Sequence, residues 1–597
     1  MHEHILMGIG LIILLGFGAQ WLAWRLKIPS ILFLLLSGII AGPVLGYLDP
    51  NELLGDVLIP FVSISVAIIL FEGGLTLKIS EFKKIGRVVT LLISVGVVIT
   101  WVITAAGAYF LLNLNMPVSV LLGAVLSVTG PTVIGPLLRN IKPQKNVSNI
   151  LKWEGILIDP IGALLAILVF EVILIGEMQQ ALQTVLLSVL RTILSGLVVG
   201  GSLAFLLAFL IKKFWIPDYL QGTASLAFVV IGFLISNYFQ AESGLLSATI
   251  MGIVLSNQTF APTKRIREFK ENLTLFIIPV LFILLSARLE FANIEPLITL
   301  SGLLFLVVVV LVGRPVGVFA STYRSGLNLR EKLFVSWVAP RGIVAAAVSS
   351  VFALRLLETN LPQIELLVPA TFFVIIGTVI LYGFTSPVVA RRLKISQADP
   401  QGVLIAGGQD WALDIAAALQ EKGFNVVVVD TNRQNISKAR MRGLNAINES
   451  IISDRTYEQL NLEGIGKMLA LTSNDEVNSL SVLQFSEEFE KINLYQLVPN
   501  TNKDELEFSP MHLRGRFLFG KGVNYNFITN KVMNGAVVKS TTLRAEFTFD
   551  DFKDEYGEDF TLLFVIINKG NRLIPVTADD KIVPQIGNTI VALVDKR

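Results

Sequence analysis

Up to about residue 394 the chain is a series of long apolar runs separated by short polar loops. About 20 consecutive apolar residues cross a bilayer as a helix. The first run is too long for the core of a signal peptide and lacks a small-residue cleavage site, so we interpret it as a membrane span. The pattern predicts a polytopic α-helical membrane domain over 1–394. We expect thirteen spans, at 5–24, 29–48, 57–77, 88–112, 116–138, 149–175, 181–211, 218–238, 242–257, 272–289, 295–320, 332–356 and 365–389.

Alternate loops between these runs differ in charge, and the alternation holds through every loop. Because positive charge stays on the cytoplasmic side, we predict a multi-pass protein of the inner membrane with its N-terminus outside and its C-terminal region in the cytoplasm. The basic loops hold Arg25 and Lys27; Lys78, Lys83, Lys84 and Arg87; Arg139, Lys142 and Lys145; Lys212 and Lys213; Lys264, Arg265, Arg267 and Lys270; Arg324, Arg330 and Lys332; and Arg391, Arg392 and Lys394. The other loops hold Asp49, Glu52, Asp56, Glu177 and Glu242.

An odd number of spans suits two six-helix halves of inverted topology, joined by the seventh span. The fifth span of each half carries Gly and Pro at mid-membrane depth: Gly130 and Pro131 in one, Pro340 and Gly342 in the other. A broken helix leaves backbone groups free, which is tolerated only where they are buried in protein or line a watery cavity. Matched breaks point to a transport site; the alternative is a pair of kinks that serve packing alone.

Ionisable side chains inside the spans are functional candidates, because each costs roughly 2.5–3.5 kcal/mol to insert. Asp159 lies near the middle of the sixth span, and Pro160 frees a backbone carbonyl beside it. A carboxylate there binds a dehydrated cation or a proton but hardly both, since either one neutralises it, and this competition gives one-for-one exchange. The alternative for Asp159 is a structural pair with an arginine.

Glu154 lies five residues before Asp159 on the same span, roughly 140° around the helix. The two carboxylates therefore do not share a face, and we predict that Glu154 is a neighbour or orienter of the site rather than a second equivalent ligand. It also lies near the cytoplasmic end of the helix, so a solvated surface glutamate is the alternative.

Three other charged residues lie in or near the spans. We predict that Glu72, at the inner end of the third span, and Arg341, in the second break, form an ion pair that ties the halves together; two separate interfacial charges are the alternative. Arg288 lies close to an outer end and is either a pathway residue or a side chain that snorkels to the interface.

The amino-acid composition excludes several classes of partner and site. Only 16% of residues are charged, against roughly a quarter in soluble proteins, which agrees with a membrane protein. The net charge of +2 gives no reason to expect a nucleic-acid partner. The absence of cysteine excludes disulfides and cysteine-bound metal. With three scattered histidines, we expect no resident metal, only a transient sodium or potassium ion at Asp159.

From residue 401 strands and helices alternate, which predicts a doubly wound α/β domain over 401–500. A small subdomain over 501–597 is expected to be β-rich from about 541, while 500–540 resists assignment. Expected strands are 403–406, 426–430, 467–471, 494–498, 562–567 and 589–594, and expected helices are 411–421, 436–442 and 476–489.

The first turn of this domain partly matches the dinucleotide fingerprint G-x-G-x-x-G/A. Gly407, Gly408 and Ala412 are candidate nucleotide-binding residues, but Gln409 stands where a second glycine should let phosphate approach. Asp430 ends the second strand, where an acidic residue can hold a ribose hydroxyl. We predict a regulatory NAD(H) or AMP, with Gln409 favouring the mononucleotide; the alternative is a domain that has lost its ligand and only dimerises.

The motifs together resemble the monovalent cation/proton antiporter superfamily, in its sodium/proton exchanger branch. The run from Phe71 to Leu75, the Thr129-Gly130-Pro131 break, the acidic sixth span and the Arg341-Gly342 pair follow in order within residues 5–390. The resemblance implies a homodimer, a core domain that moves against a dimerisation domain, and an ion bound beside crossed broken helices, with Asp159 and Thr129 at the ion. The soluble region resembles the regulatory domains that gate potassium channels and potassium-efflux antiporters.

Two positions depart from that branch. Its members usually show Thr-Asp-Pro where this chain has Gly130, and Asn-Asp where it has Ile158-Asp159. With fewer polar ligands, sodium and potassium both remain open as the cation.

We therefore expect electroneutral exchange of sodium or potassium for protons in a lipid bilayer, controlled by the cytoplasmic domain and needing no cofactor. The alternatives are a nucleotide-gated potassium efflux system or cation channel, and a redox enzyme or sensor that turns over NAD. Channel filters need rings of carbonyls, which thirteen spans with buried carboxylates do not supply. No catalytic base suggests itself in the soluble region, so we predict that the chain is not an enzyme.

Overall fold

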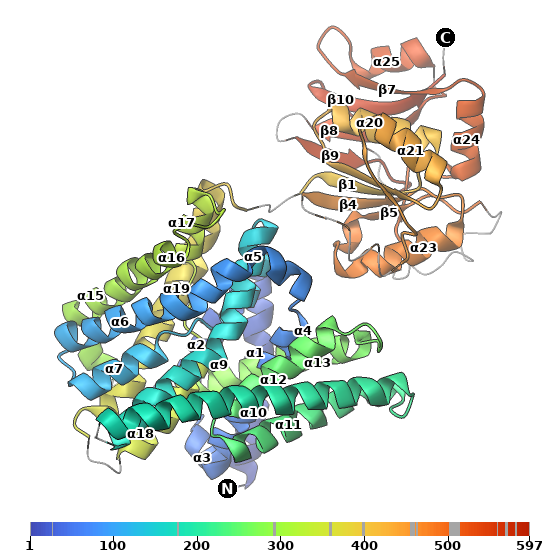
Figure 1. Cartoon of the computed structure of the whole chain (residues 1–597). Coiled ribbons are helices and arrows are strands. Elements are labelled where there is room, and N and C mark those ends of the chain that lie inside the picture. Colours follow the sequence, from blue (N-terminus) through green and yellow to red (C-terminus); the bar gives the residue numbers. More distant parts are fainter. Residues whose placement is uncertain are drawn as a thin grey trace. The chain divides into compact units, whose positions relative to one another are not determined.

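The chain forms two compact units, Met1–Ala398 and Asp399–Arg597. Figure 1 shows that the first is built from helices and that the second mixes helices and strands. The computed structural model describes residues 2–26, 28–175, 178–289, 294–357, 361–396, 400–453, 456, 460, 462, 464–500, 514–557, 559–567, 571–579 and 582–595.

The helices of the first unit agree with the predicted spans. Within the described residues, nine helices are long and apolar enough to cross a membrane, and four shorter apolar helices fill the remaining places. The helices are α1 (His2–Leu26), α2 (Ser30–Ile39), α3 (Pro50–Leu54), α4 (Leu58–Leu75), α5 (Ile79–Leu91), α6 (Val97–Leu111), α7 (Met116–Val125), α8 (Pro131–Ile141), α9 (Lys145–Ile175), α10 (Met178–Lys212), α11 (Gln221–Phe239), α12 (Ser243–Asn257), α13 (Lys264–Ala287), α15 (Leu300–Val308), α16 (Arg314–Ser321), α17 (Leu329–Trp337), α18 (Ile343–Leu357) and α19 (Leu367–Arg392).

The inverted halves are visible in matching irregularities. The fifth span of each half is broken, between α7 and α8 and again between α17 and α18. The fourth span of each half contains a π-helical turn, Leu92–Gly96 between α5 and α6 and Val309–Gly313 between α15 and α16. The predicted fold, with two interrupted helices at corresponding places, is confirmed.

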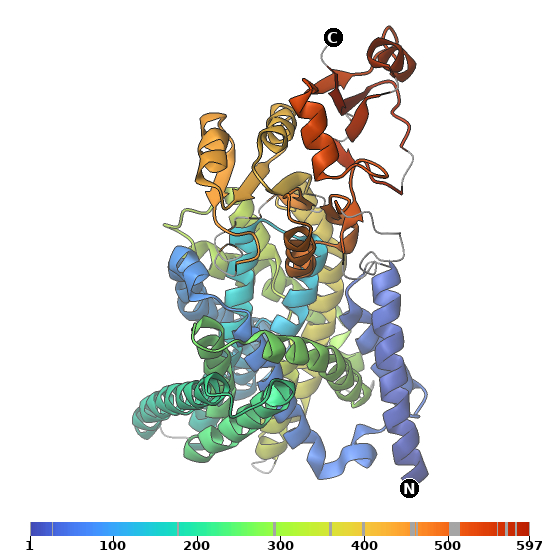
Figure 2. The ribbon, with the colours of Figure 1, turned by 90° about the vertical axis from the view of Figure 1, so that its right-hand side faces the viewer.

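The helices divide into two bundles by their packing. In the scaffold bundle, α12 packs on α4, α10 and α11, while α13 packs on α1, α2 and α4; Figure 2 shows α1 as one long dark blue helix. In the crossing bundle, α9 packs on α5, α7 and α8, α6 on α7 and α15, and α19 on α7, α8, α17 and α18. The bundles meet where α4 and α12 face α9 and α18, and where α2 faces α19.

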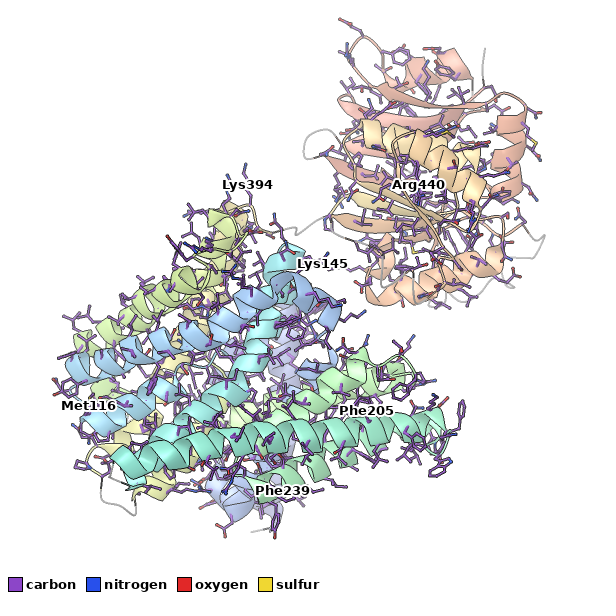
Figure 3. The ribbon with its side chains drawn as sticks, viewed as in Figure 1. Met116, Lys145, Phe205, Phe239, Lys394 and Arg440 are labelled. Atoms are coloured by element: carbon purple, nitrogen blue, oxygen red, sulfur yellow. The ribbon has the colours of Figure 1, made fainter. Side chains whose placement is uncertain are left out.

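Hydrogen bonds gather the predicted cytoplasmic loops at one end of this unit. Lys152 Nζ donates to the Thr76 carbonyl (2.8 Å), and Ser396 Oγ to the Ile141 carbonyl (2.7 Å). Lys145 and Lys394 lie at the same end, and Phe239 lies at the opposite end (Figure 3). The order of the loops thus agrees with the alternation of charge.

The second unit contains a six-stranded parallel sheet of order β3-β2-β1-β4-β5-β6. This is the order of dinucleotide-binding α/β folds. Its elements are β1 (Gly402–Ala406), α20 (Asp410–Glu421), β2 (Val426–Asp430), α21 (Arg433–Met441), β3 (Asn445–Asn448), β4 (Ile465–Ala470), α23 (Asp475–Gln484), β5 (Leu494–Gln496) and β6 (Arg516–Phe517).

An antiparallel sheet of order β7-β10-β8-β9 follows. Its inner face and the α20 side of the parallel sheet share one apolar core, in which Trp411 and Leu413 contact the cluster that includes Phe564 and Leu593. The two sheets of this unit are therefore packed together. The elements are α24 (Tyr525–Met533), β7 (Val537–Thr542), α25 (Phe549–Tyr556), β8 (Thr561–Ile567), β9 (Arg572–Pro575) and β10 (Asn588–Val594); residues 501–513 lie outside the described residues.

Candidate functional site

The two broken helices cross at a pair of glycines. The Gly130 amide donates to the Pro340 carbonyl (3.0 Å). A Cβ on Gly130 would lie 2.3 Å from the Gly342 Cα, and a Cβ on Gly342 would lie 2.4 Å from the Gly130 Cα. The backbones approach too closely for any side chain here, which gives Gly130, the departure noted in the sequence, a packing reason.

An arginine covers the carbonyls at the end of each helix that precedes a break. Arg341 Nη1 donates to the Val128 carbonyl (3.0 Å), beyond α7. Arg314 donates to the Val335 carbonyl (3.1 Å from Nη2) and the Val338 carbonyl (3.4 Å), at the end of α17. Because helix C-termini carry orphaned carbonyls and partial negative charge, these guanidinium groups stabilise both breaks.

Glu154 is fully buried and holds Arg314, the arginine at the second break, in place. Both its carboxylate oxygens accept from Arg314, with Oε2 2.8 Å from Nη2. Glu154 therefore points from α9 to α16, and the surface alternative for this residue is wrong. Its carboxylate is a bidentate partner of an arginine, so it acts in this structure as a brace of the second break.

Asp159 faces the first break. Gly155, Asp159 and Gly162 fall on one stripe of α9, four and three residues apart. A Cβ on Gly162 would meet the Val128 side chain at 2.0 Å, and one on Gly155 would lie 3.7 Å from the Pro131 Cα. Asp159 thus lies opposite the segment between Val128 and Pro131, where α8 begins, and a helix N-terminus favours negative charge.

Several buried oxygens at this place lack partners. Among the described residues, neither carboxylate oxygen of Asp159 has a hydrogen-bond partner, and the hydroxyls of Thr129 and Thr132 also have none. All three side chains are at least 95% buried. Buried polar groups in proteins are usually satisfied, so these unpartnered oxygens make this place the candidate site for a bound cation or proton.

Glu72 and Arg341 do not form the predicted ion pair. Arg341 is engaged by the Val128 carbonyl, while Glu72 lies beside the charge of Lys270 and the side chain of Thr274 on α13. The reason is that α4 belongs to the scaffold bundle, whereas the break before α18 belongs to the crossing bundle. The interaction that satisfies a buried charge at the second break is instead Glu154–Arg314.

Two hollows lie between the bundles, one on each side of Asp159 along α9. The Glu72 cavity, of about 490 Å³, is lined by α1, α2, α4 and α13 on one wall and by α8 and α9 on the other, and it reaches Thr132 and Ile156. The Glu242 pocket, of about 30 Å³, is lined by α4, α9, α18 and the start of α12, and it reaches Ala163 and Ile167. Ile156 precedes Asp159 by three residues, and Ala163 follows it by four.

Three other charged residues complete the picture of this unit. Arg288 follows the last residue of α13, and the charged group that acts on it is Asp49. The structure therefore does not place Arg288 at Asp159. Sequence reasoning missed Arg314, although it falls inside the predicted span 295–320. It also assigned Lys270 to a loop, but α13 begins at Lys264, and Lys270 is fully buried with its Nζ 5.3 Å from the centre of the Phe71 ring.

In the second unit, the candidate nucleotide residues surround the point where the strand order reverses between β1 and β4. Ligands of such sheets bind outside the carboxyl ends of the strands at this point. Gly407 follows β1 with φ +111°, a conformation that requires glycine. Ala412 is buried in α20, where a small residue lets the helix approach the sheet.

The polar groups of this crevice already bond to one another. Gln409 Nε2 donates to the Leu471 carbonyl (2.6 Å), which bridges the turns after β1 and β4. Asp430 Oδ2 accepts from the Gly408 amide (2.6 Å) and from Asn435 Nδ2 (3.0 Å). A nucleotide that enters here must replace these hydrogen bonds.

Comparison with known protein families assigns both parts of the chain. Residues 10–392 match the model of the sodium/hydrogen exchanger transmembrane family, and residues 403–506 match the TrkA-N domain. The sodium/proton antiporter 1 of Methanocaldococcus jannaschii is 28% identical over 418 residues, which cover 67% of this chain and 95% of the relative. The potassium/proton antiporter NhaP of Alkalimonas amylolytica is 26% identical over 401 residues, which cover 66% of this chain and 67% of the relative.

A solved structure shares the fold of the first unit. The sodium proton antiporter MjNhaP1 of Methanocaldococcus jannaschii, at pH 8, aligns with a TM-score of 0.57 and 25% identity. The alignment covers 65% of this chain and 99% of that structure. The predicted kinship and the predicted fold class are both confirmed, and the relatives are transporters rather than enzymes.

Proposed function

This chain belongs to the sodium/hydrogen exchanger family, and we propose that it exchanges sodium or potassium for protons, one for one, across the inner membrane. The observation that carries the proposal is the buried Asp159, whose oxygens have no partner among the described residues and which lies opposite a break in a helix. The named relatives include sodium/proton and potassium/proton antiporters, which supports both ions as candidates.

The exchange follows from charge balance at one carboxylate. Asp159 is neutralised by either a proton or a monovalent cation, and a bare carboxylate in the membrane interior is costly. The carboxylate therefore crosses between the two sides only when one of them is bound. Each cycle moves one cation against one proton, so no net charge is transported.

The two hollows support alternating access to this carboxylate. The Glu72 cavity reaches Thr132 and Ile156 on one side of Asp159, while the Glu242 pocket holds little more than a water molecule on the other. Because each hollow lies between the two bundles, movement of one bundle against the other closes one and opens the other. The positions of the basic loops support the cytoplasm as the side of the Glu72 cavity. A homodimer, as the family resemblance implies, would hold the scaffold bundle still.

The small number of polar ligands around Asp159 affects which cation the site prefers. Gly130 offers no side chain, and Ile158 offers no polar group before Asp159. A site with few fixed oxygens dehydrates a small ion less well, which favours potassium over sodium. The unpartnered hydroxyls of Thr129 and Thr132 are candidates for further ligands.

Transport in proteoliposomes tests this function. The purified chain, reconstituted with an internal pH dye, should move protons when sodium or potassium is added without a membrane potential, and choline should have no effect. A channel would instead need a potential to move net charge. Absence of proton movement with every alkali cation would contradict the proposal.

We further propose that an adenine nucleotide binds at the β1–β4 crevice of the TrkA-N domain and changes the transport rate. The strand order and the glycine at Gly407 support this site. In such binding, Asp430 releases the Gly408 amide and accepts a ribose hydroxyl instead, while the Gln409 side chain swings away from Leu471. Because a mononucleotide needs less space at Gln409 than a pyrophosphate, AMP is preferred to NAD(H).

Calorimetry on the full-length chain with NAD, NADH, AMP and ATP tests nucleotide binding, with Asp430→Ala as the site variant. Heat with one of these ligands, weakened by Asp430→Ala, is the expected result. No heat with any of them would leave the domain as a scaffold, and binding that Asp430→Ala does not change would place the ligand elsewhere.

A further inference from the structure

The Glu242 pocket contains a charge at only one of its described lining residues. Glu242 lies at the start of α12, and the rest of the lining is apolar apart from Ser63 on α4. The pocket continues the Asp159 stripe of α9, since Ala163 and Ile167 follow Asp159 at helical spacings of four and eight residues. Glu242 therefore lines a hollow on the face of α9 that carries Asp159.

The backbone around Glu242 is held firmly in an uncommon conformation. Glu242 has φ +62°, which non-glycine residues adopt only where the surroundings impose it. Ser243 Oγ donates to the Ser236 carbonyl (2.7 Å), and the Gly244 amide donates to Asn237 Oδ1 (2.8 Å). These hydrogen bonds hold the start of α12 against the end of α11. They therefore fix the position of the Glu242 backbone, from which the carboxylate side chain extends.

A positive charge from the other bundle acts on the same carboxylate. Burial raises the pKa of the Glu242 carboxyl, and the charge of Arg355, on α18, acts against that shift. Among the described residues, no ion pair within 4 Å joins the two side chains. Arg355 is exposed. It therefore lowers the attraction of the pocket for a cation without occupying the carboxylate oxygens.

We propose that Glu242 captures the transported cation at the extracytoplasmic end of the pathway and that Arg355 limits how tightly it does so. The proposal rests on the exchange function proposed above. The cation engages Glu242 when the bundles separate at the pocket, and it then passes along Ala163 to Asp159.

Sidedness provides the first test. Right-side-out and everted vesicles from the same cells present opposite faces to the added cation, and a pH dye reports exchange. We expect Glu242→Gln to raise the KM for the cation about three- to tenfold at the extracytoplasmic face and to leave the KM at the cytoplasmic face and the maximal rate unchanged. Glu52→Gln, an exposed glutamate outside the pocket lining, is the matched control and should change neither KM.

The variant Arg355→Gln distinguishes cation capture by Glu242 from a purely structural role, in which Glu242 and Arg355 together act as a latch that holds the pocket closed. Capture predicts opposite signs, with a higher KM in Glu242→Gln and a lower KM in Arg355→Gln. A latch that only keeps the pocket closed predicts that both variants change transport in the same direction, because either one breaks it. Equal signs, or an effect of Glu242→Gln at the cytoplasmic face, would overturn the proposal.

The absence of cysteine allows a test on protein that is already folded. In Glu242→Cys, a negatively charged methanethiosulfonate reagent added outside should lower the extracytoplasmic KM, and a positively charged one should raise it. Identical effects of both reagents would contradict capture. These outcomes are read in a chain that exchanges cations; failure of the parent chain to exchange would instead contradict the function itself.

Discussion

The site around Asp159 and the crevice beside Asp430 each contain a buried or half-buried aspartate that lies opposite a glycine-containing segment of another part of the fold, but the two aspartates differ in their hydrogen bonds. Asp159 has no hydrogen-bond partner among the described residues, and two neighbouring threonine hydroxyls share that state. Asp430 accepts from the Gly408 amide and from Asn435, and Gln409 bridges the crevice.

The difference concerns what a ligand must displace. Under the proposed function, a cation or proton at Asp159 would add coordination to oxygens that accept no hydrogen bond from the described residues. A nucleotide at Asp430 gains only the difference between its own hydrogen bonds and those it breaks. We therefore expect transport to require the carboxylate of Asp159. We expect the crevice beside Asp430 to bind a nucleotide weakly unless its internal hydrogen bonds are removed.

The largest effect is expected from Asp159→Asn, which should abolish exchange because Asn cannot be neutralised by a proton or a cation. The melting temperature should change by no more than about 2 °C, since no partner is left unpaired. Dye-reported transport and a thermal melt measure both. Normal transport by this variant would refute the role of Asp159.

Glu154→Gln should show the reverse pattern, with loss of stability as the primary effect. It leaves Arg314 buried without its counter-charge, which costs roughly 3–5 kcal/mol. Thermal unfolding in detergent measures it. The double variant Glu154→Leu, Arg314→Met removes both charges and should recover much of the loss; a Glu154→Gln protein as stable as the parent would show that the pair is not structural.

Gly130→Ala should destabilise the membrane unit by about 1–3 kcal/mol or more, because its Cβ meets the Gly342 backbone rather than a movable side chain. Gly135→Ala in α8 is the matched control, since a Cβ there meets nothing within 4 Å, and helix propensity predicts a gain of about 0.5–1 kcal/mol. If both variants melt alike, the helices do not cross at these glycines.

Gln409→Gly should produce the smallest change, a gain of about tenfold in nucleotide affinity, or about 1.4 kcal/mol, because the bridge to Leu471 no longer has to break. Calorimetry on the full-length chain measures it. Exchange without nucleotide should stay as in the parent. A variant that binds no more tightly than the parent would show that Gln409 does not obstruct the crevice.

The sequence by itself determined the spans, the positions of both breaks and six of the ten described strands of the second unit. These features depend on local quantities: about 20 apolar residues fill a bilayer, Gly and Pro interrupt helices, and alternating strands and helices form a parallel sheet. The same local logic identified Asp159 as an intramembrane carboxylate beside a break.

Only the tertiary structure decided which charges meet. Glu154 and Arg314 are 160 positions apart in the sequence, and no local pattern pairs them, so Glu72 and Arg341 were matched in error. The fold packs α9 beside α17 and brings Glu154 to Arg314 on α16, and an ion pair needs atoms within about 4 Å. Likewise, the close approach of Gly130 to Gly342 exists only where the two halves cross, and the hydrogen bond of Gln409 only where β1 lies beside β4.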